Sequence, residues 1–224
     1  MEINHESKVS TVFNSWAGQE RGERMAKGHD ALLLPLLDIW DFSKVTRILD
    51  LGCGNGRALQ FALSHGAKAV AGVDIAEKMI TEAKKNIPEG DFLVTPMYDL
   101  PWPDAHFSHI LSVEAIYYLT DPVAAFKEMR RVLAADGRIA ILLEFFQENE
   151  ASHIWAENLG LDMTLWSSAQ WVEAMEAAGF SGIKASRIVR EAIKSEAEFQ
   201  PSPSFPSYEM YLDYVNAGAL MLSN

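Results

Sequence analysis

RILDLGCGNG, residues 47–56, joins a predicted strand to a glycine-rich turn. Glycines at 52, 54 and 56 allow the backbone to turn tightly and let a ligand approach it without meeting a Cβ atom. The helix that follows would present free N–H groups and the positive end of its dipole at the same place. Turns of this kind serve several classes of nucleotide ligand, so the residues around the turn have to decide between them.

The segments around this turn alternate between strand and helix patterns. Strand patterns cover residues 46–51, 68–75, 91–95, 107–113 and 138–145, and helix patterns cover residues 57–65, 77–86 and 121–134. Because buried strands alternate with helices, we expect an α/β fold of the Rossmann-like, doubly wound kind. Right-handed crossovers would then bring the carboxyl ends of the strands to one edge of the sheet, where ligands bind.

Residues on both sides of this core complete the expected fold. Residues 8–40 indicate two helical pieces that separate near Gly18 and Gly22, with Met25 on the apolar face of the second piece. Further along, residues 167–178 predict a helix, residues 181–189 a strand, and the apolar tail AGALMLSN a buried last strand. We therefore expect a seven-stranded, mostly parallel sheet with an antiparallel final strand and an N-terminal helical cap. One domain would span residues 1–224, with the cap at about 1–43, the cofactor-binding core at about 44–145 and a substrate-side part at about 146–224.

The composition limits the classes of partner. There are 19 basic and 31 acidic residues, and a net charge of −12 makes the chain a poor partner for nucleic acid phosphates. The basic pairs at 84–85 and 130–131 are too short to change this and are typical of solvated helix faces. A single cysteine, Cys53, fits a reducing compartment, and we find neither a signal peptide nor a membrane span. We expect a cytoplasmic protein without a membrane partner, and an apolar C-terminal patch would permit a homodimer.

The residues near the glycine turn discriminate between cofactors. A dinucleotide-binding loop needs a glycine at position 57, where this chain has Arg57, and no Gly-Lys-Ser/Thr follows as in a P-loop. Asp50 would repel a pyrophosphate, whereas it would attract a ligand with sulfonium and ammonium groups. Asp74, at the end of the second predicted strand, suits the two hydroxyls of a ribose, whichever nucleoside carries them.

Four segments together resemble a known family. ILDLGCGNG, VDIAEKM, DLPWPDAHF and EMRRVLAADG stand in the order and spacing typical of class I S-adenosylmethionine-dependent methyltransferases. The resemblance runs from about Lys44 to Leu143 and is strongest to the small-molecule enzymes akin to ubiquinone and sterol methyltransferases. It implies S-adenosylmethionine as cofactor and methyl transfer to a small organic acceptor by in-line displacement.

The resemblance also implies cofactor-binding positions. They are Asp50, Gly52, Cys53, Gly54 and Gly56 at the methionine part, Asp74 at the ribose, and Ile75 and Met79 at the adenine ring. Family members often have Asp-Ala where this chain has Pro96 and Met97, so adenine recognition differs in detail. The backbone N–H of Met97 or Tyr98, or the side chain of Asp99, would replace the usual contact.

Candidate catalytic residues follow from the same sheet edge. Glu114 ends the fourth predicted strand, where it would meet the cofactor's ammonium, act as a base, or simply be a satisfied polar residue at the start of a helix. Tyr117 and His29 are further candidates, and Phe13 and Trp16 would belong to a lid over the cofactor. Histidines and acids show no metal-ligand spacing along the chain, so the sequence predicts no metal site.

Two other functions compete with methyl transfer. The same topology would suit an NAD-dependent oxidoreductase, against which Arg57 and Asp50 argue. The altered adenine segment would also suit a non-catalytic protein that binds an adenosyl ligand. Cofactor binding distinguishes the first alternative, and turnover of S-adenosylmethionine distinguishes the second.

Overall fold

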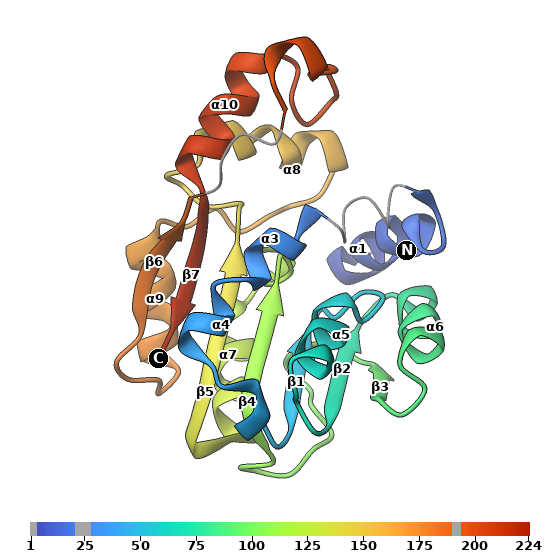
Figure 1. Cartoon of the computed structure of the whole chain (residues 1–224), viewed down its shortest axis with the longest axis vertical. Helices are drawn as coiled ribbons and strands as arrows, with labels where there is room; N and C mark the ends of the chain where they lie inside the picture. Colours follow the sequence, from blue (N-terminus) through green and yellow to red (C-terminus); the bar gives the residue numbers. More distant parts are fainter. Residues whose placement is uncertain (1–3, 21–27, 190–193) are drawn as a thin grey trace.

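The computed structural model describes residues 4–20, 28–189 and 194–224. These residues form a seven-stranded sheet in the order β3-β2-β1-β4-β5-β7-β6, with helices packed around it (Figure 1). The strands are β1 (Ile48–Leu51), β2 (Val70–Asp74), β3 (Asp91–Val94), β4 (Phe107–Val113), β5 (Leu133–Leu143), β6 (Lys184–Ile188) and β7 (Ala219–Ser223). The expected doubly wound architecture is thereby confirmed.

Five strands run parallel through the centre and one side of the sheet. The fully buried β1 pairs with β2 through Ile48 and Val70, and with β4 through Ile48 and His109. β3 continues the parallel ladder beyond β2, and β5 continues it beyond β4. The carboxyl ends of these strands therefore lie along one edge, which is the edge that binds ligands in open α/β sheets.

The last strand inserts between the fifth and sixth strands and runs against both. Met221 of β7 lies opposite Leu142 of β5 and Ser186 of β6, in antiparallel register. Every residue of β7 is buried. Burial of this apolar tail confirms the prediction of a final antiparallel strand.

Helices cover both faces, and alternate strand residues supply the two cores. Leu49 and Leu51 pack in one cluster with Phe126 and Trp171, whereas Ile48 packs in the other with apolar residues of the opposite helices. The helices are α1 (His5–Trp16), α3 (Asp30–Leu33), α4 (Leu36–Ile39), α5 (Arg57–Ser64), α6 (Glu77–Asn86), α7 (Pro122–Val132), α8 (Ile154–Leu159), α9 (Ser168–Ala177) and α10 (Tyr208–Ala217). Among the described residues, no helix combines the length and hydrophobicity of a membrane span.

The N-terminal segment differs from the expected pair of helical pieces. Its first piece is α1, but the described part of the second piece is divided into the single-turn helices α3 and α4. Pro35 lies between them, and its missing N–H prevents one continuous hydrogen-bond ladder. Gly22 and Met25 lie outside the described residues, so the predicted break at Gly22 is not described.

The fifth strand also begins earlier than predicted. β5 starts at Leu133, directly after α7, because Leu133 pairs with Phe107 across a register shift in β4. The tyrosine-rich segment near the C-terminus forms α10. Its buried Tyr211 and Tyr214 pack in a separate cluster with Ala151, beside α8 (Figure 1).

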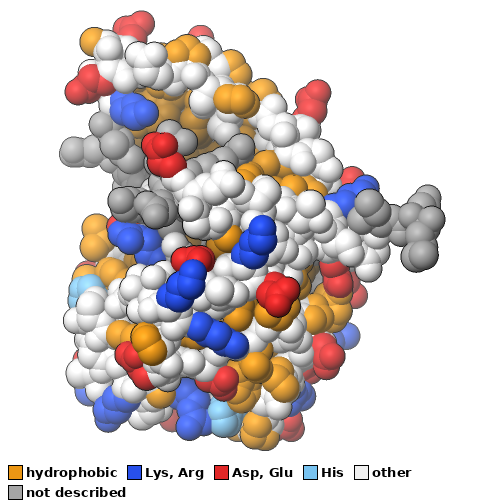
Figure 2. All heavy atoms as spheres, turned by 90° about the vertical axis from the view of Figure 1, so that its right-hand side faces the viewer, with side chains coloured by type: hydrophobic (Ala, Val, Ile, Leu, Met, Phe, Trp, Pro, Cys, Tyr) orange, Lys and Arg blue, Asp and Glu red, His pale blue; other side chains and the backbone are white. Residues whose placement is uncertain are grey.

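Charged side chains of both signs are interspersed on the face that carries α6 (Figure 2). Lys85 of the predicted basic pair bonds to Glu82 within α6, with 2.7 Å between Nζ and Oε1. Arg131 of the second pair bonds to Glu128 and Asp104. Both pairs thus belong to solvated helix faces with acidic neighbours.

Candidate active site

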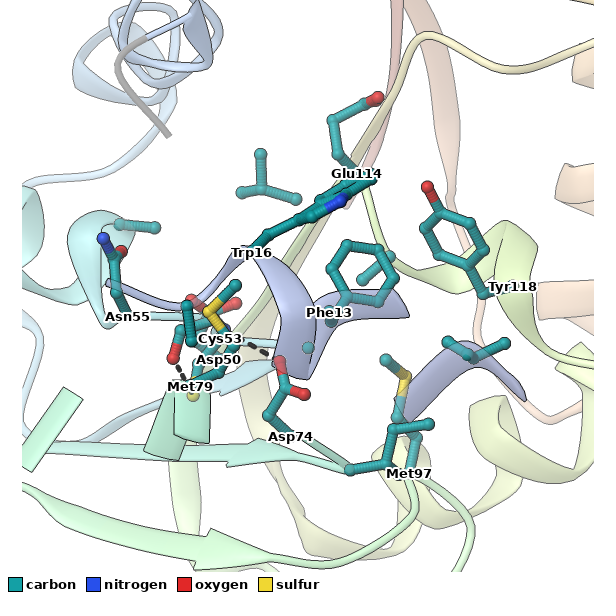
Figure 3. A pocket seen from close by; sticks show the side chains of 18 of the residues that line it. Phe13, Trp16, Asp50, Cys53, Asn55, Asp74, Met79, Met97, Glu114 and Tyr118 are labelled. Carbon is teal, nitrogen blue, oxygen red and sulfur yellow. Dashed lines mark hydrogen bonds between the residues drawn. The ribbon is translucent and has the colours of Figure 1, made fainter. Parts of the chain in front are cut away.

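A cavity of about 240 Å³ lies at the carboxyl ends of β1, β2 and β4, with α1 across it (Figure 3). Phe13 and Trp16 approach it from α1, and Asp50, Cys53 and Asp74 from the sheet. Of the predicted site residues, those on the cavity wall are His29, Asp50, Gly52, Cys53, Gly54, Asp74, Ile75, Met79, Met97, Tyr98 and Glu114. The fold therefore brings together most of the positions that the sequence singled out.

The glycine turn is held against β2 and is open toward the cavity. The N–H groups of Gly52 and Cys53 both donate to the carbonyl oxygen of Val73, at 2.8 and 3.0 Å. Gly52 has a φ of +74°, and a Cβ there would lie 2.3 Å from the Cβ of Ala115. A Cβ at Gly54, with φ +51°, would meet no atom within 4 Å. Gly52 is thus required for packing, and Gly54 leaves room for a ligand against the backbone.

Asp74 ends β2 and is held by two backbone amides. Its Oδ2 accepts a hydrogen bond from the Gly54 N–H at 3.0 Å, and its Oδ1 accepts one from the Ala76 N–H at 2.8 Å. Burial raises the pKa of this carboxyl, and the amide donors oppose that rise. Each oxygen keeps a lone pair, so the oriented carboxylate can accept two further hydroxyl donors.

Asp50 is the penultimate residue of β1, beside the glycine turn, and is almost fully buried, at 2% exposure. Its Oδ1 has no hydrogen-bond partner among the described residues. Burial, together with the Asp74 carboxylate, raises the pKa of Asp50 to about 8. An unpartnered carboxyl oxygen in a low-dielectric site is costly, and a positively charged ligand group would remove that cost.

Cys53 has a structural place in the turn. It is buried, its side chain packs against Gly72 of β2, and burial raises the pKa of its thiol well above the ordinary value. A neutral thiol is a poor nucleophile. Cys53 therefore contributes its backbone and its small volume.

Glu114 follows β4 and is fixed in an unusual backbone conformation, with φ +55°. Its Oε1 accepts the Glu144 N–H at 2.5 Å, and its Oε2 accepts the Tyr117 hydroxyl at 2.8 Å. Left-handed backbone at a residue other than glycine is typical of functional sites where the surroundings impose the geometry. The carboxylate is thus oriented from two sides and lies on the cavity wall.

Helix α1 covers the cavity and is anchored to the opposite wall. The Ser10 hydroxyl donates to the carbonyl oxygen of Ile75 at 2.9 Å, and Asn14 Oδ1 accepts the Lys78 N–H at 2.9 Å. Phe13 packs edge-on against Trp16 and Tyr118, with 5.1 Å between ring centroids in each pair. These contacts place Phe13 and Trp16 of α1 on the cavity wall, and their role as a lid over the cofactor stays a prediction.

Three predicted site residues do not line the cavity. Gly56 is the residue before α5, with φ +82°, and a Cβ there would lie 3.3 Å from Ile87, the residue after α6, so this glycine serves helix packing. Asp99 is exposed, and its backbone carbonyl accepts the Thr95 hydroxyl at 3.0 Å. Tyr117 lies in the core behind Glu114, where burial raises the pKa of its hydroxyl well above the ordinary value.

Sequence reasoning also missed contributors to the site. Asn55 lines the cavity from the glycine turn, and Glu144, directly after β5, is buried next to Glu114. Arg57 lines the cavity, and its Nε and Nη2 groups donate to the two carboxylate oxygens of Asp30. The position of Glu144 at the end of a predicted strand was the signal that would have identified it.

The residues present fit S-adenosylmethionine. Asp74 presents an oriented carboxylate for ribose hydroxyls, and the unpartnered oxygen of Asp50 suits a cationic group. Ile75, Met79 and Met97 form an apolar wall for a purine ring.

Comparisons with known proteins agree with this fit. A family profile described as a methyltransferase domain matches residues 49–141. Malonyl-[acyl-carrier protein] O-methyltransferase of Geobacter sulfurreducens is 30% identical over 77% of this chain and 66% of its own. Cycloartenol-C-24-methyltransferase 1 of Oryza sativa is 29% identical over 75% of this chain and 52% of its own.

A solved structure matches almost the entire chain. It is the partner of the Trm112 methyltransferase activator in a Haloferax volcanii complex, with 27% identity, a TM-score of 0.83, and coverage of 99% of this chain and 98% of that one. The first curated relatives are matched over only 37–66% of their own length. The site geometry and these similarities have one explanation in common: the chain belongs to the S-adenosylmethionine-dependent methyltransferases.

Proposed function

We propose that this protein transfers the methyl group of S-adenosylmethionine to a small organic acceptor. When bound, the cofactor supplies a methyl group on a positively charged sulfur, which the acceptor's nucleophile displaces in line. The observation that carries the proposal is Asp50, a buried carboxyl with an unpartnered oxygen on the cavity wall beside the open Gly54 turn. A cationic ligand satisfies this group, whereas a pyrophosphate would be repelled by it.

The chain's own residues supply binding, orientation and exclusion of water. Asp74 would hold the ribose through its remaining lone pairs, with its carboxylate already oriented by Gly54 and Ala76. Helix α1, anchored through Ser10 and Asn14, would keep water from the reacting atoms. Alignment in a dry cavity is the main requirement for transfer of an already activated methyl group.

The acceptor would occupy the part of the cavity between Trp16, Tyr118 and Glu114. Aromatic rings there provide flat apolar contacts, and Glu114 provides an oriented polar group near the acceptor. Similar proteins include 27-O-demethylrifamycin SV methyltransferase and cycloartenol-C-24-methyltransferase 1, which supports an acceptor of small-molecule class.

Calorimetric titration with S-adenosylmethionine, S-adenosylhomocysteine and NAD tests cofactor choice. We expect binding of the two adenosyl ligands and none of NAD, and the reverse result would favour an oxidoreductase. Transfer of labelled methyl groups to a panel of hydroxyl, amine, thiol and carbon acceptors then tests catalysis. Binding without transfer to any acceptor would favour a non-catalytic adenosyl-binding protein.

We also propose that the protein binds a small activator protein similar to Trm112. The support is the match to the Haloferax volcanii partner of Trm112 over nearly the full length of both chains. Co-expression with a Trm112-like protein should give a complex that co-elutes on size exclusion and binds the cofactor more tightly than the isolated chain. Elution as two separate peaks at micromolar concentration would contradict this partner.

A further inference from the structure

Three potential metal ligands from three separate elements meet beside the cavity. They are His29 at the start of α3, Glu114 after β4 and Glu144 after β5, and their ligand atoms all lie within 4.8 Å of one another. Among the described residues, this is the group of histidine and acidic side chains whose arrangement suits a metal ion. The three lie far apart in the sequence, so spacing along the chain could not indicate them.

The topology of the sheet explains why the two carboxylates meet. β4 and β5 are parallel neighbours, with Val113 opposite Leu142, so the residues after both strands emerge side by side. The Glu144 N–H donates to Glu114 Oε1 at 2.5 Å, which locks the two positions together. His29 is brought to them by the N-terminal segment, which is held to α5 through the ion pair between the adjacent Asp30 and Arg57.

The burial of the group distinguishes it from an ordinary surface cluster. Glu144 is 3% exposed and Glu114 is 9% exposed, and His29 is half-buried on the cavity wall. Two carboxylates close together in a low-dielectric site repel each other, so the site favours positive charge. One imidazole nitrogen with two carboxylates is a donor set that suits Mn²⁺, Zn²⁺ or Fe²⁺.

Glu114 is also supported as metal ligands usually are. The Tyr117 hydroxyl and the Glu144 amide each donate to one of its oxygens, which fixes the orientation of the carboxylate. Hydrogen bonds of this kind orient ligands and tune their basicity.

We propose that His29, Glu114 and Glu144 form a binding site for one divalent transition-metal ion at the acceptor end of the cavity. Its chemical role rests on the proposed function: the ion would hold an oxygen of the acceptor and ease loss of its proton to water. The oxygen would then bond to the methyl carbon as the carbon–sulfur bond breaks and its electron pair returns to sulfur. Metal binding itself requires neither the cofactor nor turnover.

The test is a titration of the full chain with Mn²⁺, after treatment with a chelator and in the absence of cofactor. Binding is detected as a loss of the electron paramagnetic resonance signal of free Mn²⁺. We expect one saturable site, and His29→Gln and Glu144→Gln should each weaken it about 10-fold or more. Glu82→Gln is the matched control, because Glu82 lines the same cavity outside the cluster and pairs with Lys85. This variant should bind Mn²⁺ like the unaltered protein.

No binding by the unaltered protein up to ~1 mM Mn²⁺, near the weak limit of protein sites for divalent ions, would overturn the proposal. Unchanged binding in both cluster variants would do the same. If Glu144→Gln does not fold by circular dichroism, the half-buried His29→Gln decides the outcome. A parallel titration with S-adenosylmethionine separates the two proposals, since cofactor binding without Mn²⁺ binding would refute only the metal site.

Discussion

Asp50→Asn should abolish a pH dependence of cofactor binding that the buried carboxyl creates. Burial, with Asp74 nearby, raises the pKa of Asp50 to about 8, so the group is about 90% protonated at pH 7. A cationic ligand that requires the ionised form must drive this proton off, at a cost of about 1.4 kcal/mol at pH 7 and about 2.7 kcal/mol at pH 6. We therefore expect the affinity for S-adenosylmethionine to rise about tenfold from pH 6 to pH 7 and to level off above pH 8.

Calorimetry in two buffers with different ionisation enthalpies measures the proton directly. At pH 7, binding should release about 0.9 proton from Asp50, and the Asp50→Asn protein should lack this release. The ligand's own amino group titrates near pH 8 as well. Its contribution is common to both proteins, so the difference between them isolates Asp50.

Stability of the ligand-free protein provides a second readout of the same group. The pKa of Asp50 is higher in the folded protein than its ordinary value of 3.8, so folding retains a proton that the unfolded chain loses. Stability from this group is complete below about pH 4 and falls as the pH rises toward 8. The Asp50→Asn protein should lack that fall in thermal unfolding. Identical proton release and identical pH profiles in the two proteins would refute the reasoning.

The remaining predictions concern the ribose site, the turn, the core and the lid. Asp74→Ala should weaken adenosyl ligands about tenfold or more in calorimetry, since a charge-assisted hydrogen bond contributes about 1.5–3 kcal/mol; unchanged affinity would remove Asp74 from the ribose site. Gly52→Ala should lower the free energy of unfolding by about 1–3 kcal/mol, because its Cβ would meet Ala115 and its φ is positive; a melting temperature equal to that of the unaltered protein would contradict this. Trp171→Ala, at a fully buried position, should cost about 3–5 kcal/mol in chemical denaturation, and a loss below about 1 kcal/mol would show that the core relaxes around it. Ser10→Ala removes one lid anchor of about 1 kcal/mol and should weaken cofactor binding up to about fivefold with unchanged stability of the core; a matching loss of global stability would show that α1 is not a separate cover.

Patterns that depend on burial alone made the central sheet predictable. β4 and α6 begin and end where the sequence indicated, because apolar spacing and flanking polar residues set their limits. The predicted helix that ended at residue 134 was too long, because Leu133 already pairs with Phe107 of β4. The apolar spacing within the helix does not indicate a pairing with a strand that is distant in sequence. The prediction of one helical piece around Pro35 was wrong for another reason. The apolar spacing there is that of a helix, but the proline interrupts the ladder of backbone hydrogen bonds.

The part of the candidate site that lies at the carboxyl ends of parallel strands could be predicted from the sequence. Asp50 is one residue before the end of its parallel strand, Asp74 is at the end and Glu114 is directly after it, and the fold gathers such ends at one edge. Asp99 and Tyr117 were assigned by closeness in sequence to that edge, but side-chain direction depends on turns whose geometry the sequence does not fix. Asp99 faces solvent and Tyr117 the core.

Glu144 also lies directly after a parallel strand, but the family motifs mark the earlier strands and leave the end of the fifth strand unmarked. Its position beside Glu114 has an electrostatic consequence. A buried carboxylate is expensive on its own, and a second one beside it raises the cost, so a sheet edge with Glu114 and Glu144 together favours a cation. The sheet edge where we propose that Asp50 faces a sulfonium therefore has a second region, at Glu114 and Glu144, that favours positive charge. A metal ion there would differ from the cofactor in chemistry, but the buried carboxyl groups would attract both because both carry positive charge. Binding of the metal ion can be measured in the absence of the cofactor.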